Sequence, residues 1–160
     1  MGDSEKTTQG FTSEYNLVGY EKPAIIDTGT SLIYAPSGLG EELVQRLARG
    51  STYLFDPTSG LTVVSCDEKA NYQDFYLTID DAQFKILADD YFMTMTTVNE
   101  TTGEKTTTCF LGIVSMIDLN YWLIGDVFLR GYYSIFDNSN HNAARMGFAP
   151  HATSTKPKVV

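Results

Sequence analysis

Cationic residues, cysteines and long apolar runs are all scarce in this chain, and each shortage argues against a class of function. The 160 residues include 11 Lys and Arg against 20 Asp and Glu, a net charge of −9. That balance argues against binding to nucleic acid or to an anionic membrane surface, because both are negatively charged. Whether the acidic surface serves solubility alone or adaptation to acid is left open by composition.

No apolar segment is long enough to cross a bilayer. The longest run, Cys109 to Ile117, ends at Asp118, whereas a spanning helix needs about 20 apolar residues. The first residues after Met1 also lack the apolar stretch of a signal peptide. The sequence therefore predicts no membrane span.

The few cysteines and histidines argue against metal and triad chemistry. Cys66 and Cys109 lie far apart, with neither a CxxC motif nor a nearby histidine, so no metal site and no cofactor are predicted. Either the two thiols pair in an oxidising compartment or they stay free inside the protein. His141 and His151 fall in a turn and a tail, away from any Ser or Cys nucleophile, which argues against a triad hydrolase.

Strand-forming residues are abundant, with ten Tyr and nine Phe. Apolar and polar residues alternate from Phe75 to Ile79 and continue, after an Asp-Asp turn, from Phe84 to Ala88. Turn residues separate further apolar segments and predict two hairpins, 91–98 with 105–113 and 132–136 with 145–148. We expect one mainly β domain, because a chain of this length is enough for one core and too short for two.

One or two short helices are expected. The first extends from Ser37 to Arg49, with Gly50 as its stop, and its apolar residues share one face. A second begins at Asp126, whose side chain is expected to cap residues 127–130.

The domain is expected to extend over residues 23–150. Residues 1–22 are polar and rich in Gly, Thr and Ser, so we expect a poorly ordered arm with a partial strand near 15–18. Residues 151–160 are expected to form a flexible tail.

The strongest chemical feature is the segment Ala24-Ile-Ile-Asp-Thr-Gly-Thr-Ser-Leu-Ile33. Apolar strand residues lead into an Asp-Thr-Gly turn and then resume, so Asp27 is expected to lie in an apolar wall. Burial disfavours a charged carboxylate, so we expect the pKa of Asp27 to be raised. Gly29 permits close approach of the backbone. Hydroxyls that can orient the carboxylate come from Thr28, Thr30 and Ser31.

Taken alone, the Asp-Thr-Gly triplet more often marks an aspartate that caps its own turn. A second segment, Tyr121 to Asp137, changes this interpretation. With the turn at Asp27 it resembles the pepsin-like aspartic protease family, in which hydrophobic-hydrophobic-Asp-Thr/Ser-Gly-Thr/Ser is followed by hydrophobic-hydrophobic-Gly. The likeness covers about residues 23 to 150 and is to the C-terminal lobe. The matching segments are Ile25–Ser31, Leu123–Gly125, Phe136–Asp137 and Met146–Ala149.

The resemblance implies one mainly β lobe of a bilobal acid endopeptidase. In that lobe Asp27 is the catalytic carboxylate, Thr28 is a buried hydroxyl that bonds to the other lobe, and Thr30 is the hydroxyl beside the carboxylate. Gly29 and Ser31 line the cleft. Three further residues fall at substrate-pocket positions, with plain core or surface roles as equal alternatives: Tyr34, Met116 and Leu123.

The resemblance also implies a disulfide between Cys66 and Cys109, because the family pairs a Val-Ser-Cys strand with a Cys that lies before a Met. Val64-Ser-Cys66 and Cys109 to Met116 reproduce this pattern. The implied disulfide and the family resemblance together indicate a protein that is secreted or delivered to a lysosome or vacuole.

Two other features stand near these motifs. A short disulfide that many relatives carry before the catalytic loop is missing, since Val18 and Lys22 occupy its places. Asn99-Glu-Thr101 is an N-glycosylation sequon on a predicted turn, a tripeptide that also occurs often by chance.

Pepsin-like catalysis requires two carboxylates that share a proton and activate a water, and this chain has one Asp-Thr/Ser-Gly. We therefore expect a partner lobe with the second aspartate and a polypeptide substrate between the lobes. Alone, the chain is expected to be inactive and to self-associate weakly through its cleft wall. The alternatives are an inactive pepsin-like binding, inhibitor or storage protein and, less favoured, a homodimer of retroviral-protease type. This lobe is larger than such subunits and has no recognisable flap hairpin.

Overall fold

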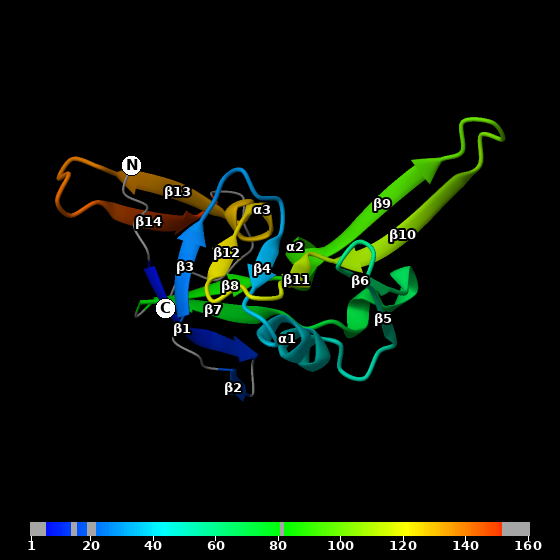
Figure 1. Cartoon of the computed structure of the whole chain (residues 1–160), viewed down its shortest axis with the longest axis horizontal. Coiled ribbons are helices and arrows are strands. Elements are labelled where there is room, and N and C mark those ends of the chain that lie inside the picture. The colour runs from blue at the N-terminus through cyan, green and yellow to red at the C-terminus, as the bar shows by residue number, and fades with distance from the viewer. Residues whose placement is uncertain (1–5, 14–15, 19–21, 81, 152–160) are drawn as a thin grey trace.

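The computed structural model describes residues 6–13, 16–18, 22–80 and 82–151. Figure 1 shows a body of β-strands with a helix packed beside it and two hairpins that extend from the body in different directions. The prediction of a mainly β lobe is confirmed.

The largest sheet has eight strands in the order β11-β4-β12-β3-β1-β7-β8, with β2 paired to the outer part of β1. Its strands are β1 (Lys6–Ser13), β2 (Asn16–Val18), β3 (Lys22–Ile26), β4 (Ile33–Ala35), β7 (Phe75–Ile79), β8 (Ala82–Ile86), β11 (Ile113–Ser115) and β12 (Trp122–Ile124). β12 is parallel to β3 on one side and antiparallel to β4 on the other. This arrangement positions the candidate active site.

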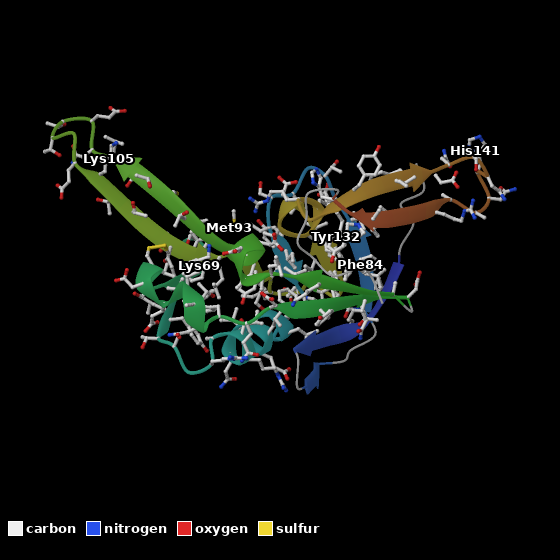
Figure 2. All side chains as sticks on the ribbon, turned by 180° about the vertical axis from the view of Figure 1, so that it is seen from behind. Lys69, Phe84, Met93, Lys105, Tyr132 and His141 are labelled. Carbon is white, nitrogen blue, oxygen red and sulfur yellow. A yellow bond between two sulfur atoms is a disulfide. The ribbon has the colours of Figure 1, made fainter. Side chains whose placement is uncertain are left out.

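Two smaller sheets complete the strands. A four-stranded sheet has the order β5-β6-β10-β9, and β13 pairs with β14. Their strands are β5 (Tyr53–Asp56), β6 (Leu61–Val64), β9 (Phe92–Val98), β10 (Lys105–Leu111), β13 (Tyr132–Asp137) and β14 (Arg145–Pro150). Both predicted hairpins, β9 with β10 and β13 with β14, are confirmed. Figure 2 shows Lys105 near the end of one hairpin and His141 at the end of the other, on opposite sides of the molecule.

The end of β10 differs from the prediction, which continued this strand to Ile113. The strand ends at Leu111, and after Gly112 the chain enters β11 in the other sheet. Gly112 donates its N–H to the Tyr91 carbonyl at 2.7 Å. A Cβ at Gly112 would lie 2.7 Å from a methyl group of Val127, so a larger residue at the point where the chain changes sheets would have to displace that side chain.

Four helical segments occur among the described residues: α1 (Leu39–Leu47), the 3₁₀ segment η1 (Cys66–Asn71), α2 (Ala88–Tyr91) and α3 (Asp126–Leu129). The apolar face predicted for α1 is confirmed, since Leu43, Val44 and Leu47 are buried. η1 and α2 were not predicted, because single turns of this length carry no helical periodicity.

An aromatic cluster joins the β13–β14 hairpin to the main sheet. The ring of Phe84 on β8 packs edge-on against Phe128, Tyr132 and Phe148, with centroids 5.4–5.7 Å apart. The Tyr132 hydroxyl donates to the carbonyl of Lys85 at 2.7 Å. Figure 2 shows Phe84 and Tyr132 close together at the root of this hairpin.

The N-terminal segment contains more strand than expected. Where the sequence predicted an arm with one partial strand, β1 lies inside the large sheet between β3 and β7, and β2 pairs with it. Residue 15 of the expected strand and residues 152–160 of the expected tail lie outside the described residues. The domain limits at 23 and 150 stay a prediction.

The predicted disulfide between Cys66 and Cys109 is confirmed, with Cα atoms 5.2 Å apart. It ties the start of η1 to β10, at a point where Cys109 lies opposite Val64 in the sheet register. Figure 2 shows this bond where the β9–β10 hairpin leaves the body. The two alternatives that the residues alone left open are therefore decided in favour of pairing.

Candidate active site

The catalytic candidate, Asp27, lies in a loop that must cross the end of a strand. Because β12 lies between β3 and β4, the chain cannot pass directly from one to the other. It leaves β3 at Ile26 and enters β4 at Ile33, so residues 27–32 cross the end of β12 beside Gly125. The sheet order thus brings the two recognised sequence motifs together.

Backbone hydrogen bonds fix both ends of this crossing. Asp27 donates its N–H to the carbonyl of Ile124 at 3.0 Å, and Gly125 donates to the carbonyl of Leu32 at 3.0 Å. The loop is therefore held on β12 by main-chain atoms, which fixes the backbone from which the Asp27 side chain extends.

The first turn of α3 holds the middle of the loop. The N–H of Asp126 donates to the carbonyl of Thr30 at 2.8 Å, and that of Val127 donates to Ser31 at 3.3 Å. These groups would otherwise lack partners, as at the start of any helix. The predicted cap by the Asp126 side chain is wrong: Gly125 is the N-cap residue and no side chain caps this helix.

The carboxylate of Asp27 accepts two hydrogen bonds from its own turn. One oxygen accepts the Gly29 N–H at 2.9 Å, and the other accepts the hydroxyl of Thr30. The hydroxyl and then the N–H favour the charged form, so they lower the pKa of Asp27, against a smaller opposing effect of burial. The expected rise of this pKa by burial is wrong for the chain alone, in which Asp27 is partly exposed.

The same local geometry recurs at Asp56. One of its oxygens accepts the Thr58 N–H at 2.9 Å and the other accepts the Ser59 hydroxyl at 2.6 Å, which also lowers the pKa of Asp56. The turn by itself therefore does not mark a catalytic aspartate. What sets Asp27 apart is the crossing over β12 and the groove beside it.

An open groove of about 620 Å³ adjoins the loop. It brings together Gly29, Thr30 and Ser31 of the turn with the three predicted pocket residues, which come from three different strands or loops. The complete lining is Gly29, Thr30, Ser31, Leu32, Tyr34, Leu61, Met93, Phe110, Met116 and Leu123. An apolar groove that begins beside a carboxylate is suited to bind an extended chain with amide groups near that carboxylate.

Thr28 stands apart from this groove. Its side chain was expected to be buried against another lobe, and within this chain it is exposed. Its bond to a partner lobe stays a prediction. Among the large apolar side chains of the groove Met116 is the most exposed, with 48% of its surface accessible.

Comparison with known proteins identifies the family of this chain. A family model described as eukaryotic aspartyl protease matches residues 7–151. The chain belongs to the eukaryotic aspartyl protease family. The resemblance to pepsin-like proteases drawn from the sequence motifs is therefore confirmed.

Similar curated proteins carry the names of individual proteases. The aspartyl protease chain is 32% identical over 133 residues to gastricsin of Mus musculus, covering 79% of this chain and 29% of gastricsin. It is 34% identical over 128 residues to cathepsin E of Aquarana catesbeiana, covering 79% and 28%. It is 29% identical over 130 residues to pepsin A of Suncus murinus, covering 81% and 30%. The matched part is thus less than a third of each relative.

Four groove residues of this aspartyl protease chain were missed: Leu32, Leu61, Met93 and Phe110. Met93 and Phe110 face each other across β9 and β10, and Figure 2 shows Met93 where β9 joins the body. The register of the two strands in the predicted hairpin would have placed Met93 and Phe110 together. Nothing in the sequence shows that this pair faces the Asp27 loop.

The described part of the chain contains no group of three or more His, Cys, Asp or Glu side chains suited to hold a metal. No helix within it is both long and apolar enough to cross a membrane.

Proposed function

We propose that this chain is the C-terminal half of an aspartic endopeptidase in which Asp27 is one of two catalytic carboxylates. The observation that carries the proposal is the placement of the Asp27 carboxylate, held by Gly29 and Thr30 beside an apolar groove. Membership of the aspartyl protease family supports the reaction class.

The chemistry requires a second carboxylate close to the first. Two such groups cannot both be ionised at short range, so they share one proton and titrate as a pair. The ionised member takes a proton from a water whose oxygen attacks the peptide carbonyl carbon, and the protonated member donates to the carbonyl oxygen. In the turn at Asp27, Gly29 and Thr30 hold the carboxylate in one orientation for this exchange.

A partner lobe carries the second carboxylate in this proposal. Exposed Thr28, next to Asp27, is available to bond across to it. The β13 strand also exposes three large apolar side chains, Tyr133, Ile135 and Phe136, at 66%, 50% and 57%. Surfaces of this kind on a folded domain favour a partner.

The groove supports a polypeptide substrate. Tyr34, Met116 and Leu123 are proposed to contact substrate side chains, and Gly29 and Ser31 to line the cleft at the reacting bond. The Cys66–Cys109 disulfide supports an oxidising environment, so we propose that the protein is secreted or delivered to a lysosome or vacuole.

The test uses the complete two-lobed enzyme with Asp27→Asn and the matched control Asp56→Asn. Each variant replaces a carboxylate that accepts one backbone N–H and one hydroxyl from its own turn. We expect Asp27→Asn to remain folded and to lose hydrolysis of a denatured protein substrate, while Asp56→Asn keeps it. Full activity of a folded Asp27→Asn enzyme would contradict the proposal. An unmodified protein that binds peptides without cleaving them would favour the alternative, an inactive binding or inhibitor protein.

A further inference from the structure

The β9–β10 hairpin carries a feature that the protease site does not use. Of the seven Asn in the sequence, at 16, 71, 99, 120, 138, 140 and 142, only Asn99 is followed two positions later by Thr or Ser. Asn99, Glu100 and Thr101 form the tripeptide recognised for N-linked glycosylation. The structure places this tripeptide at the tip of the hairpin, which Figure 1 shows reaching away from the body.

The turn at the tip leaves the acceptor amide available. The Asn99 side-chain oxygen accepts the N–H groups of Thr101 at 2.9 Å and Thr102 at 3.1 Å. The Asn99 N–H donates to the Glu104 carbonyl and its carbonyl accepts from Gly103, both at 2.8 Å. Every residue from 94 to 107 is exposed. The side-chain nitrogen is therefore turned away from these bonds, with solvent-exposed residues around it.

The hairpin also has edges that a glycan would protect. β9 is the edge strand of its sheet, and β6 pairs with β10 only at residues 109–111, so the outer part of the hairpin is a two-stranded arm. Exposed strand edges recruit other strands. Met95 and Val98 lie along this arm with 50% and 52% of their surfaces accessible.

We propose that Asn99 is an N-glycosylation site whose glycan covers the open end of the β9–β10 arm. This rests on the secretory localisation proposed above. In the transfer, the Asn99 side-chain nitrogen bonds to the anomeric carbon of an oligosaccharide carried on a polyprenyl diphosphate. The bond from that carbon to the diphosphate oxygen breaks, the amide loses one proton, and the lipid diphosphate leaves. Figure 1 shows the tip of the hairpin well away from the end of β3, where the Asp27 loop begins.

The test is translation of the full chain, fused to a cleavable signal peptide, in the presence of rough microsomes. Protease-protected chains have entered the lumen, whatever the natural compartment of the protein. We expect protected chains to gain mass that a glycan-releasing amidase removes, leaving an aspartate in place of the asparagine. Protected chains without this gain would overturn the site without bearing on Asp27.

Two neighbouring threonines supply matched controls. Thr101→Ala destroys the tripeptide, whereas Thr102→Ala preserves it and removes the hydroxyl that accepts the Glu104 N–H at 3.3 Å. We expect Asn99→Gln and Thr101→Ala to abolish the mass gain, and Thr102→Ala and Thr101→Ser to retain it. A mass gain that survives Thr101→Ala would place the modification elsewhere.

A separate measurement tests whether the glycan covers the β9–β10 arm. Glycosylated chains and the same chains after glycan release are compared by analytical ultracentrifugation over a range of concentrations. Both keep the same groove and the same β13 surface, and an Asn99→Asp chain without a glycan controls for the aspartate that the amidase leaves. We expect the released chains to self-associate more strongly. Equal association would reject the covering role and leave only the modification.

Discussion

The backbone oxygen of Thr30 occupies the space that a side chain at Gly125 would need. A Cβ at Gly125 would lie 1.9 Å from that oxygen and 2.5 Å from its carbon. Both are main-chain atoms of the loop that carries Asp27, so no rotation of a side chain relieves the overlap. The glycine of the second sequence motif is thus required by the main chain of the first, which lies nearly a hundred positions earlier.

We expect Gly125→Ala to displace the Asp27 loop. Overpacking of this kind destabilises proteins by about 1–3 kcal/mol, and the complete enzyme should also lose activity because the carboxylate moves. The control is Gly147→Ala, whose Cβ would meet Ile135 at an ordinary contact distance of 3.7 Å. Chemical denaturation and hydrolysis of a protein substrate measure the two effects. A Gly125→Ala enzyme as stable and active as Gly147→Ala would refute this steric account.

Thr30→Val tests the electrostatics of the candidate carboxylate. The Thr30 hydroxyl is the largest cause of the lowered pKa of Asp27, so its removal should raise that pKa toward the ordinary value of 3.8. NMR titration of the Asp27 carboxyl carbon in this chain measures the shift. Ser59→Ala is the matched control, expected to raise the pKa of Asp56 and leave that of Asp27 unchanged.

The sign of the linked stability effect follows from the direction of the shift. Because the folded-state pKa of Asp27 is below its unfolded value, the ionised group stabilises the fold above the unfolded pKa. This contribution disappears as the pH falls through the folded pKa. Thr30→Val should therefore lose stability at neutral pH and little at strongly acid pH. An unchanged pKa of Asp27 in Thr30→Val would show that the hydroxyl does not bond to the ionised form.

Loss of the disulfide should destabilise the lobe. Cys66 and Cys109 enclose a separation of 43 residues, which corresponds to about 4 kcal/mol in the chain-entropy description of a cross-link. Thiol counting on the denatured, unreduced chain should find no free thiol. The double variant Cys66→Ala with Cys109→Ala should unfold at lower denaturant. Because Cys109 is buried, comparison with the reduced unmodified chain separates the cross-link from the packing. Two free thiols would contradict the pairing.

The sequence predicted those parts of the fold that repeat a local pattern. α1 was recognisable because Leu43, Val44 and Leu47 return to one face at helical spacing, and the hairpins because turn residues separate alternating strands. α2 is a four-residue turn, too short for a period to show. β1 was missed because its polar sequence resembles a loop, and only pairing with β3 and β7 makes it a strand.

Sequence motifs named the candidate residues of the site but did not describe their environment. Asp27 was chosen as the catalytic candidate because a motif names it. It is partly exposed in this chain alone, since apolar flanks do not determine what packs over the loop they lead into. The similar turn at Asp56 shows that hydrogen-bond geometry at an aspartate is common. Met93 was missed because the groove forms where separate strands converge, a relationship that no local sequence pattern encodes.

We expect this chain by itself to fold, because its core includes fully buried Trp122 and Phe75, and to hydrolyse no peptide from acid to neutral pH. The pKa of the partly exposed Asp27 is lowered by Thr30 and Gly29, with no carboxylate among the causes, so nothing forces Asp27 to share a proton. The groove and the exposed apolar side chains of β13 should instead produce weak self-association.

Hydrolysis by a dimer of this chain would contradict this expectation, and the dependence of its rate on chain concentration would reveal it. A two-fold dimer could bring two copies of Asp27 together, with the exposed Thr28 of each near the axis. Hydrolysis by such a dimer at low concentration rises with the square of the chain concentration, whereas a contaminating protease gives a linear rise. The assay therefore measures initial rates on a denatured protein over a wide range of chain concentration, with Asp27→Asn and Asp56→Asn alongside. A squared dependence that disappears in Asp27→Asn and persists in Asp56→Asn would replace the half-enzyme proposal with a homodimer.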